Sequence, residues 1–241
     1  PEPVLTAALT ETLCSDIATN RALSVSNGVA VNSYYWSAAP TNTGGMTGGN
    51  TRIAPGSLLA ITDVFANATA ATQTATYAVI PRSTLGCDGN ATNVVINVNP
   101  KPRGFNDTKT TCSNITPNYN LTANVNNIGS GGNGVASTFS WVATVNPNVG
   151  NESIVPVISA TINDVLTNVT SIPSNVTYTV TPTSTANSCA GNTFTVIVTV
   201  DPEPVLTAGL TQTICSDVAS NRSLTITNGV GMQGFYWTAV P

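Results

Sequence analysis

The sequence predicts an all-β protein made of tandem immunoglobulin-like β-sandwiches, and three observations support this. The chain repeats itself: residues 1–40 and 202–241 are identical at about 24 of 40 aligned positions. Several segments alternate apolar and polar residues with a period of two, as in strands with one buried face. Thr, Ser, Asn and Gly are abundant, whereas the charged residues that favour helices make up only 7% of the chain.

A shorter period of about 100 residues, near the usual size of a domain, divides the chain further. Each full unit carries a Tyr-centred strand, a Cys-x-Gly loop and a strand that runs into proline; the repeated positions are Tyr77 and Tyr178, Cys87 and Cys189, Gly89 and Gly191. We therefore predict one sandwich at residues 1–99, a second at 100–201, and the N-terminal part of a third at 202–241, which lacks its second half.

Residues 176–181 show the strand pattern best. Val176, Tyr178 and Val180 are predicted to point into the core, and the threonines between them toward solvent. Residues 194–200 alternate in the same way. Because proline cannot donate a hydrogen bond to a sheet, each x-Pro-x-Pro segment is predicted to end one unit and to begin the next with a stiff, extended joint.

An aromatic residue stands two positions before a Trp in each unit, on the predicted third strand. One Trp there, with about seven short strands per unit, is typical of an immunoglobulin-like sandwich. The predicted core anchors are Trp36, Trp141, Trp237, Tyr77 and Tyr178. Each Tyr is expected to brace the preceding corner, which is the Ile-x-Asp-x-φ-x-Asn-x-Thr element at 61–69 or 162–170. An aromatic ligand site is the less favoured interpretation, because repeated strand aromatics are usually core.

The residues of this second unit resemble a known repeat type. Asp164–Thr170, Val176–Ser184, Cys189–Gly191 and Val196–Pro202 together resemble PKD-like repeats. The resemblance implies a setting in very large secreted surface proteins of Bacteroidota, including gliding-motility adhesins. The Asp-Phe-Gly-Asp signature of ordinary PKD domains is missing after each Trp, so the resemblance is to the PKD-like subgroup.

Five cysteines fall at equivalent positions: Cys14, Cys112 and Cys215 early in a unit, Cys87 and Cys189 late. In a Thr- and Asn-rich chain without His, they predict disulfides formed in an oxidising, extracellular compartment. Zinc is not expected, because no CxxC or Cys/His cluster exists. Buried free thiols are the remaining alternative.

The pairing of the cysteines stays open between two schemes. Within units, Cys14 would pair with Cys87 and Cys112 with Cys189, which leaves Cys215 without a partner. Between units, Cys14 would pair with Cys189. The early and late turns of one sandwich could lie about 20 Å apart, whereas a disulfide needs Cα atoms within about 7 Å. Stacked neighbours would bring such turns together, which slightly favours the bond between units.

Two other kinds of site recur. Asn-x-Ser/Thr, the acceptor pattern for glycosylation, occurs at Asn67, Asn90, Asn106, Asn114, Asn120, Asn151, Asn168, Asn175 and Asn221, but a chain of this composition produces many such patterns by chance. The recurring Asp63 and Asp164 could bind calcium. Each stands nearly alone among acids, so a role in the turn is favoured.

Several classes of function are disfavoured. The chain has no His, no nucleophile elbow and no phosphate loop, so we predict no catalytic residue, no cofactor site and no metal site. The net charge of −4 without a basic stripe argues against nucleic acid or anionic membrane as partners. No apolar run approaches the roughly 18 residues that a spanning helix needs.

The leading hypothesis is a structural repeat segment of a large extracellular adhesin, which acts as a disulfide-stapled spacer or stalk at the cell surface. Its partners would be further repeats of the same chain and an unknown surface or glycan receptor. The alternative is a building block of a regular extracellular filament or sheath, with homopolymeric neighbours that pack laterally or exchange strands. A carbohydrate-binding module ranks last, because most aromatic residues are assigned to cores.

Overall fold

The computed structural model describes residues 1–53 and 59–239, and it is nearly all β, as predicted. The chain divides into two compact units. The first comprises Pro1–Phe105, Thr122–Thr138 and Thr181–Asn192; the second comprises Asn106–Leu121, Phe139–Val180 and Thr193–Pro241. Three segments of the predicted second sandwich therefore group with the first: residues 100–105, Thr122–Thr138 and Thr181–Asn192. The last two residues of the predicted third unit lie outside the described part of the chain.

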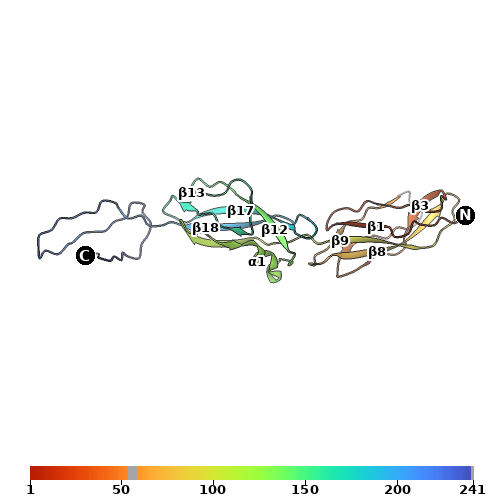
Figure 1. The fold of residues 1–241 in the computed structure, drawn as a ribbon, viewed down its shortest axis with the longest axis horizontal. Helices are drawn as coiled ribbons and strands as arrows, with labels where there is room; N and C mark the ends of the chain where they lie inside the picture. The colour runs from red at the N-terminus through yellow and green to blue at the C-terminus, as the bar shows by residue number, and fades with distance from the viewer. Residues whose placement is uncertain (54–58, 240–241) are drawn as a thin grey trace. The chain divides into compact units, whose positions relative to one another are not determined.

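The first sandwich contains one larger sheet and two short strand pairs (Figure 1). The larger sheet has the order β1 (Thr10–Cys14), β9 (Thr92–Asn99), β8 (Gln73–Ser83) and β3 (Val31–Tyr35), and β4 (Thr41–Asn42) also pairs with β8. The short pairs are β2 (Arg21–Ala22) with β6 (Ala60–Ile61), and β5 (Thr47–Gly48) with β7 (Phe65–Ala66). The core between them includes Leu5, Leu9, Leu23, Tyr34, Trp36, Ile61, Phe65, Tyr77, Val79, Val94, Ile96 and Val98.

The second sandwich repeats this arrangement with β10–β18. Its larger sheet has the order β10 (Asp107–Cys112), β18 (Phe194–Asp201), β17 (Ser174–Ser184), β12 (Ser137–Ala143) and β14 (Val157–Ile158). The short pairs are β11 (Tyr119–Asn120) with β15 (Thr161–Ile162), and β13 (Val149–Gly150) with β16 (Thr167–Asn168). Its buried side chains include Leu121, Val125, Phe139, Trp141, Ile162, Leu166, Val176, Tyr178, Val180, Phe194, Val196 and Val198.

The alternation predicted for residues 176–181 is present in β17. Val176, Tyr178 and Val180 are fully buried. The threonines between them are half-buried rather than fully solvated, because β17 is a central strand with β18 on one side and β12 on the other. Neighbouring strands thus cover part of a face that the sequence pattern alone assigns to water.

The first strand of each sandwich runs parallel to the last. In the first sandwich β1 pairs with β9, with Cys14 opposite Asn99. In the second, β10 pairs with β18, with Cys112 opposite Asp201. Parallel pairing therefore places the early cysteine at the end of the sandwich where the chain leaves it, beside the following Pro-x-Pro segment.

One short helix, α1 (Leu121–Asn126), and a 3₁₀ turn, η1 (Ile128–Ser130), depart from the expectation of strands and loops alone. Leu121 and Val125 stand at i and i+4 on α1 and are buried. Asn124, on the same face, donates through Nδ2 to the carbonyl of Phe105 and accepts from its N–H. Burial of one face and this backbone contact stabilise a helix that the residue propensities do not favour.

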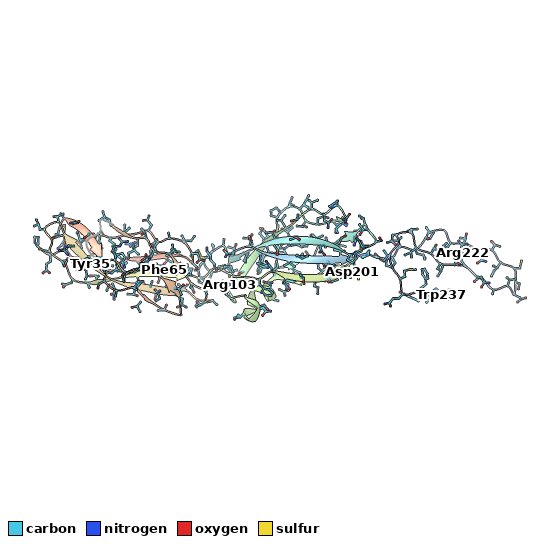
Figure 2. The ribbon with its side chains drawn as sticks, turned by 180° about the vertical axis from the view of Figure 1, so that it is seen from behind. Tyr35, Phe65, Arg103, Asp201, Arg222 and Trp237 are labelled. Atoms are coloured by element: carbon cyan, nitrogen blue, oxygen red, sulfur yellow. A yellow bond between two sulfur atoms is a disulfide. The ribbon has the colours of Figure 1, made fainter. Side chains whose placement is uncertain are left out.

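Residues 202–239 form no strand in the described structure, although Leu206 and Ile226 make the isolated bridge that Leu5 and Val25 make in the first sandwich. Trp237, a predicted core anchor, is 77% exposed (Figure 2). That prediction is wrong for this structure. Residues 202–239 have no counterparts of β8 and β9, which cover Trp36 in the first sandwich.

Candidate functional site

Each sandwich contains a half-buried hydrogen-bonded bracket, in which a Tyr of the long strand β8 or β17 and a residue just after β5 or β13 both contact the Asp of the corner. In the second, the Tyr178 hydroxyl donates to Asp164 Oδ2 at 2.9 Å. Ser153 donates to the same carboxylate through its N–H at 2.8 Å and through Oγ at 2.7 Å. In the first, Tyr77 and Asn50 make the equivalent contacts with Asp63. The corner predicted from the repeated motif is therefore held by the Tyr of the next long strand.

Burial of the two tyrosines has an electrostatic consequence. Removal from solvent is the main cause that raises the pKa of Tyr77 and of Tyr178, and the neighbouring Asp carboxylate raises the pKa of each further. Both phenols therefore stay protonated and act as donors. Because Asp63 and Asp164 are occupied by protein donors, they serve the turn; among the described residues, no group of three or more Cys, Asp or Glu residues is placed to hold a metal ion.

Trp36 and Trp141 are each 1% exposed and pack edge-on against the tyrosines, with ring centroids 5.1 Å apart for Trp36–Tyr77 and 5.5 Å apart for Trp141–Tyr178. Trp36 Nε1 donates to the Asn50 carbonyl at 2.6 Å. Trp141 Nε1 has no partner within the described chain. These rings fill the cores and are not placed as a ligand platform.

In two of the nine glycosylation patterns, the Asn side chain is both buried and hydrogen-bonded to the backbone of its corner. Asn67 Nδ2 donates to the carbonyls of Ala71 and Val98, and Asn168 Nδ2 donates to those of Ile172 and Val200. Both side chains are buried. The amide nitrogen that a glycan would modify is therefore engaged inside the corner in the folded state.

The structure contains a disulfide between Cys14 and Cys189, with Cα atoms 5.7 Å apart. Cys14 ends β1, and Cys189 lies in the loop between β17 and β18 that groups with the first compact unit. The within-unit pairing is absent, because parallel pairing of β1 with β9 sends Cys14 to one end of the sandwich, whereas the loop of Cys87 precedes β9 at the other end.

The other three predicted disulfide cysteines, Cys87, Cys112 and Cys215, are unpaired and exposed in this structure. The observed bond joins the early cysteine of one unit to the late cysteine of the next. Cys112 and Cys215 are early cysteines, and Cys87 is a late one.

The Pro-x-Pro segment that begins each unit lies against the glycine of the Cys-x-Gly loop in the same unit. A Cβ atom on Gly191 would stand 2.0 Å from the Pro102 carbonyl oxygen, and one on Gly89 would stand 2.0 Å from that of Pro3. Neither distance is possible for a side chain, so close passage of the backbone requires glycine at both positions.

An asparagine clamps each of these segments by the same two hydrogen bonds. Asn133 Nδ2 donates to the Lys101 carbonyl, and its Oδ1 accepts from the Arg103 N–H. Asn27 holds Glu2 and Val4 in this way, and Asn228 holds Glu203 and Val205. Our sequence reasoning missed these residues; the signal was an Asn-Gly pair in every unit, at Asn27, Asn133 and Asn228.

The residue after Cys-Ser contacts the middle residue of the next Pro-x-Pro segment. Asp16 Oδ2 lies 3.8 Å from Lys101 Nζ, beside a recess of about 150 Å³, and Asn114 Nδ2 donates to Glu203 Oε2 at 2.8 Å. Asp16, Asn114 and Asp217 all have positive φ, which Asp and Asn tolerate better than most residues. The preceding serine fixes this turn, since Ser15 Oγ accepts from Asn67 N–H at 2.9 Å and Ser113 Oγ from Asn168 N–H at 3.0 Å.

These contacts position backbone segments and cross-link them, and they bring together no group suited to catalysis. No helix of the described residues is long and apolar enough to cross a membrane. The protein is therefore of the class of tandem β-sandwich repeats with a structural site at the joint.

Comparison with known families agrees with this class. The PKD-like domain family matches residues 11–102 and again 109–204. The chain belongs to this family and contains two copies of the domain. The resemblance found in the sequence is thereby confirmed for the family.

No curated protein matches the chain. Solved structures that share features with it include fibronectin(III)-like modules of Clostridium thermocellum CbhA, at 13% identity and a TM-score of 0.23, over 83% of this chain and 95% of that one. The D00–D0 domain of intimin has 11% identity and a TM-score of 0.31, over 80% of this chain and 98% of that one. Human mucin-like protocadherin EC1-2 has 8% identity and a TM-score of 0.27, over 83% of this chain and 100% of that one. Scores this low carry no argument about function.

Proposed function

We propose that this chain is a spacer segment of a large extracellular adhesin, in which PKD-like sandwiches are joined in tandem and stapled by disulfides. PKD-like repeats with a disulfide fit a structural extracellular protein. The absence of a catalytic constellation among the described residues is consistent with this role. The adhesin setting is the inference that the sequence resemblance supports.

The Cys14–Cys189 disulfide is the observation that carries the proposal. It encloses residues 15–188, which include every strand of the two described sandwiches except β1 and β18. A force applied to the ends of the chain passes from Cys14 through the disulfide to Cys189. The enclosed residues then carry no tension through their backbone, so the segment keeps its length under load.

Single-molecule stretching of the full chain tests this role. At about 3.5 Å per residue, the residues between the two cysteines hold about 600 Å of contour length. We expect none of this length to be released from the oxidised protein, and two unfolding steps that release it after reduction or in Cys189→Ser. Cys87→Ser is the matched control, since it removes an exposed free thiol. Release of the full length from the oxidised wild type would refute a load-bearing staple.

The filament hypothesis is the second candidate, in which the sandwiches pack laterally or exchange strands. Leu206 is 52% exposed and Trp237 77% exposed, whereas their first-sandwich equivalents Leu5 and Trp36 are 3% and 1% exposed. Later residues of the same chain would cover these side chains in a spacer, and strands of a neighbouring chain would cover them in a filament. Electron microscopy of the native particle separates the two candidates: single threads one sandwich wide support the spacer, and a thicker helical filament supports the polymer.

A further inference from the structure

We propose that the residue after Cys-Ser and the middle residue of the next Pro-x-Pro segment form a charge-matched pair that stabilises the joint between consecutive repeats, and with it the disulfide found there. This deepens the proposed function and rests on it, because it takes the joint as the contact that holds consecutive repeats. The partner surface is therefore a Pro-x-Pro segment of defined charge, from the next repeat of the array.

The first pair combines opposite charges. Asp16 faces Lys101 at 3.8 Å, and the lysine side chain is only 21% exposed. The turn that carries Asp16 is fixed by Ser15, and Asn133 holds the backbone on both sides of Pro102, at Lys101 and Arg103. These hydrogen bonds fix the backbone that carries both residues, so the two side chains extend from defined positions.

The second pair uses different residues at the same two positions. Asn114 takes the place of Asp16, and Glu203 takes the place of Lys101, at 2.8 Å. An amide can donate to a carboxylate, whereas an Asp at this position would put two negative charges side by side. The two joints therefore differ at both positions together, and in each the change keeps the contact attractive.

The disulfide beside the first pair offers a direct measurement. The equilibrium between Cys14–Cys189 and glutathione reports how strongly the joint holds the two thiols together. We would measure it in the full chain for wild type, Lys101→Glu, Asp16→Asn and the double variant. Asn at position 16 preserves the turn, because Asn114 adopts the same positive φ. Lys109→Glu is the matched control, since Lys109 is an exposed lysine with no ion pair within the described chain.

We expect Lys101→Glu to lower the equilibrium constant for the disulfide about threefold to fivefold relative to Lys109→Glu, the effect of a partly exposed ion pair. Adding Asp16→Asn should restore the equilibrium constant to within about twofold of wild type, because the first joint then carries the same Asn–Glu pair as the second joint. Equal values for Lys101→Glu and Lys109→Glu, or no recovery in the double variant, would overturn charge matching. Either result leaves the stretching test of the spacer role unaffected, because that test depends on the disulfide alone.

Discussion

Tyr178 and Asp164 show how one side-chain pair fixes a corner of the sandwich. Tyr178 is fully buried, and its hydroxyl is satisfied only because Asp164 lies opposite. The carboxylate in turn accepts both donors of Ser153, so the strand, the corner and the loop after the Trp strand meet at one group. Loss of the Tyr178 hydroxyl removes one donor from a half-buried carboxylate, which is destabilising because the hydrogen bond has a charged acceptor.

At this scale we predict that Tyr178→Phe lowers the free energy of unfolding of the second sandwich by about 1–3 kcal/mol, because the hydrogen bond has a charged acceptor. Urea denaturation followed by Trp fluorescence measures it. The matched control is Tyr236→Phe, since Tyr236 is 98% exposed. Equal denaturation midpoints for the two variants would show that the bracket contributes nothing.

The same tyrosines predict the response to alkaline pH. Their pKa values are raised by burial in the folded state, whereas an unfolded tyrosine ionises near pH 10. Above that pH the unfolded chain binds fewer protons than the folded one, so stability falls as pH rises, by about 1.4 kcal/mol per pH unit for each tyrosine. Denaturation at pH 9, 10 and 11 should show this fall, and Tyr178→Phe should make it shallower. An unchanged slope would contradict the assignment.

At the scale of elements, the Pro-x-Pro segment is positioned by two features of its own unit and one of the preceding unit. The Cys-x-Gly loop leaves room for it, the Asn-Gly turn clamps it, and the parallel first strand delivers the preceding unit's early cysteine beside it. None of these features is a strong sheet or core interaction. The joint is therefore sensitive to small steric changes that the sandwiches would tolerate.

We predict that Gly191→Ala disrupts this packing, because its Cβ would meet the Pro102 carbonyl oxygen at 2.0 Å and Pro182 Cγ at 2.9 Å. The expected cost is about 1–3 kcal/mol, seen as faster amide exchange at residues 100–105. Gly231→Ala is the control, since nothing lies within 4 Å of its added Cβ. Similar exchange in both variants would mean that the segment does not depend on this contact.

At the scale of the whole molecule, the disulfide spans 175 positions and joins the first strand of the first sandwich to the loop between β17 and β18. The two larger sheets have separate strand sets, and each core has its own Trp–Tyr pair. The disulfide therefore stabilises the protein mainly by constraining the unfolded chain and the joint, and it contributes less to the packing of either core.

We predict that Cys14→Ser retains both sandwiches but lowers the global free energy of unfolding by about 2–5 kcal/mol, the range for a long closed loop. Far-ultraviolet circular dichroism would check the fold, and chemical denaturation would measure the loss. Cys112→Ser, which removes an exposed free thiol, should match wild type. Loss of native β-structure in Cys14→Ser would show that the staple is required for folding.

Local patterns determined much of this protein. Alternation in residues 176–181 predicted the strand, and the repeated Ile-x-Asp-x-φ-x-Asn-x-Thr element predicted a corner next to the Tyr strand, because side-chain periodicity and turn chemistry are encoded within a few residues. Local patterns could not show that Trp36 is buried and Trp237 exposed, because burial depends on strands that lie far along the chain.

The tertiary structure decided the contacts between distant segments. The choice of Cys189 as the partner of Cys14 depends on the parallel pairing of β1 with β9, and parallel pairing leaves no mark in either strand alone. The meeting of Asp16 with Lys101, and of Asn114 with Glu203, follows from the same pairing. Sequence supplied the residues for each sandwich, and the topology of its first and last strands determined which of them meet at the joint.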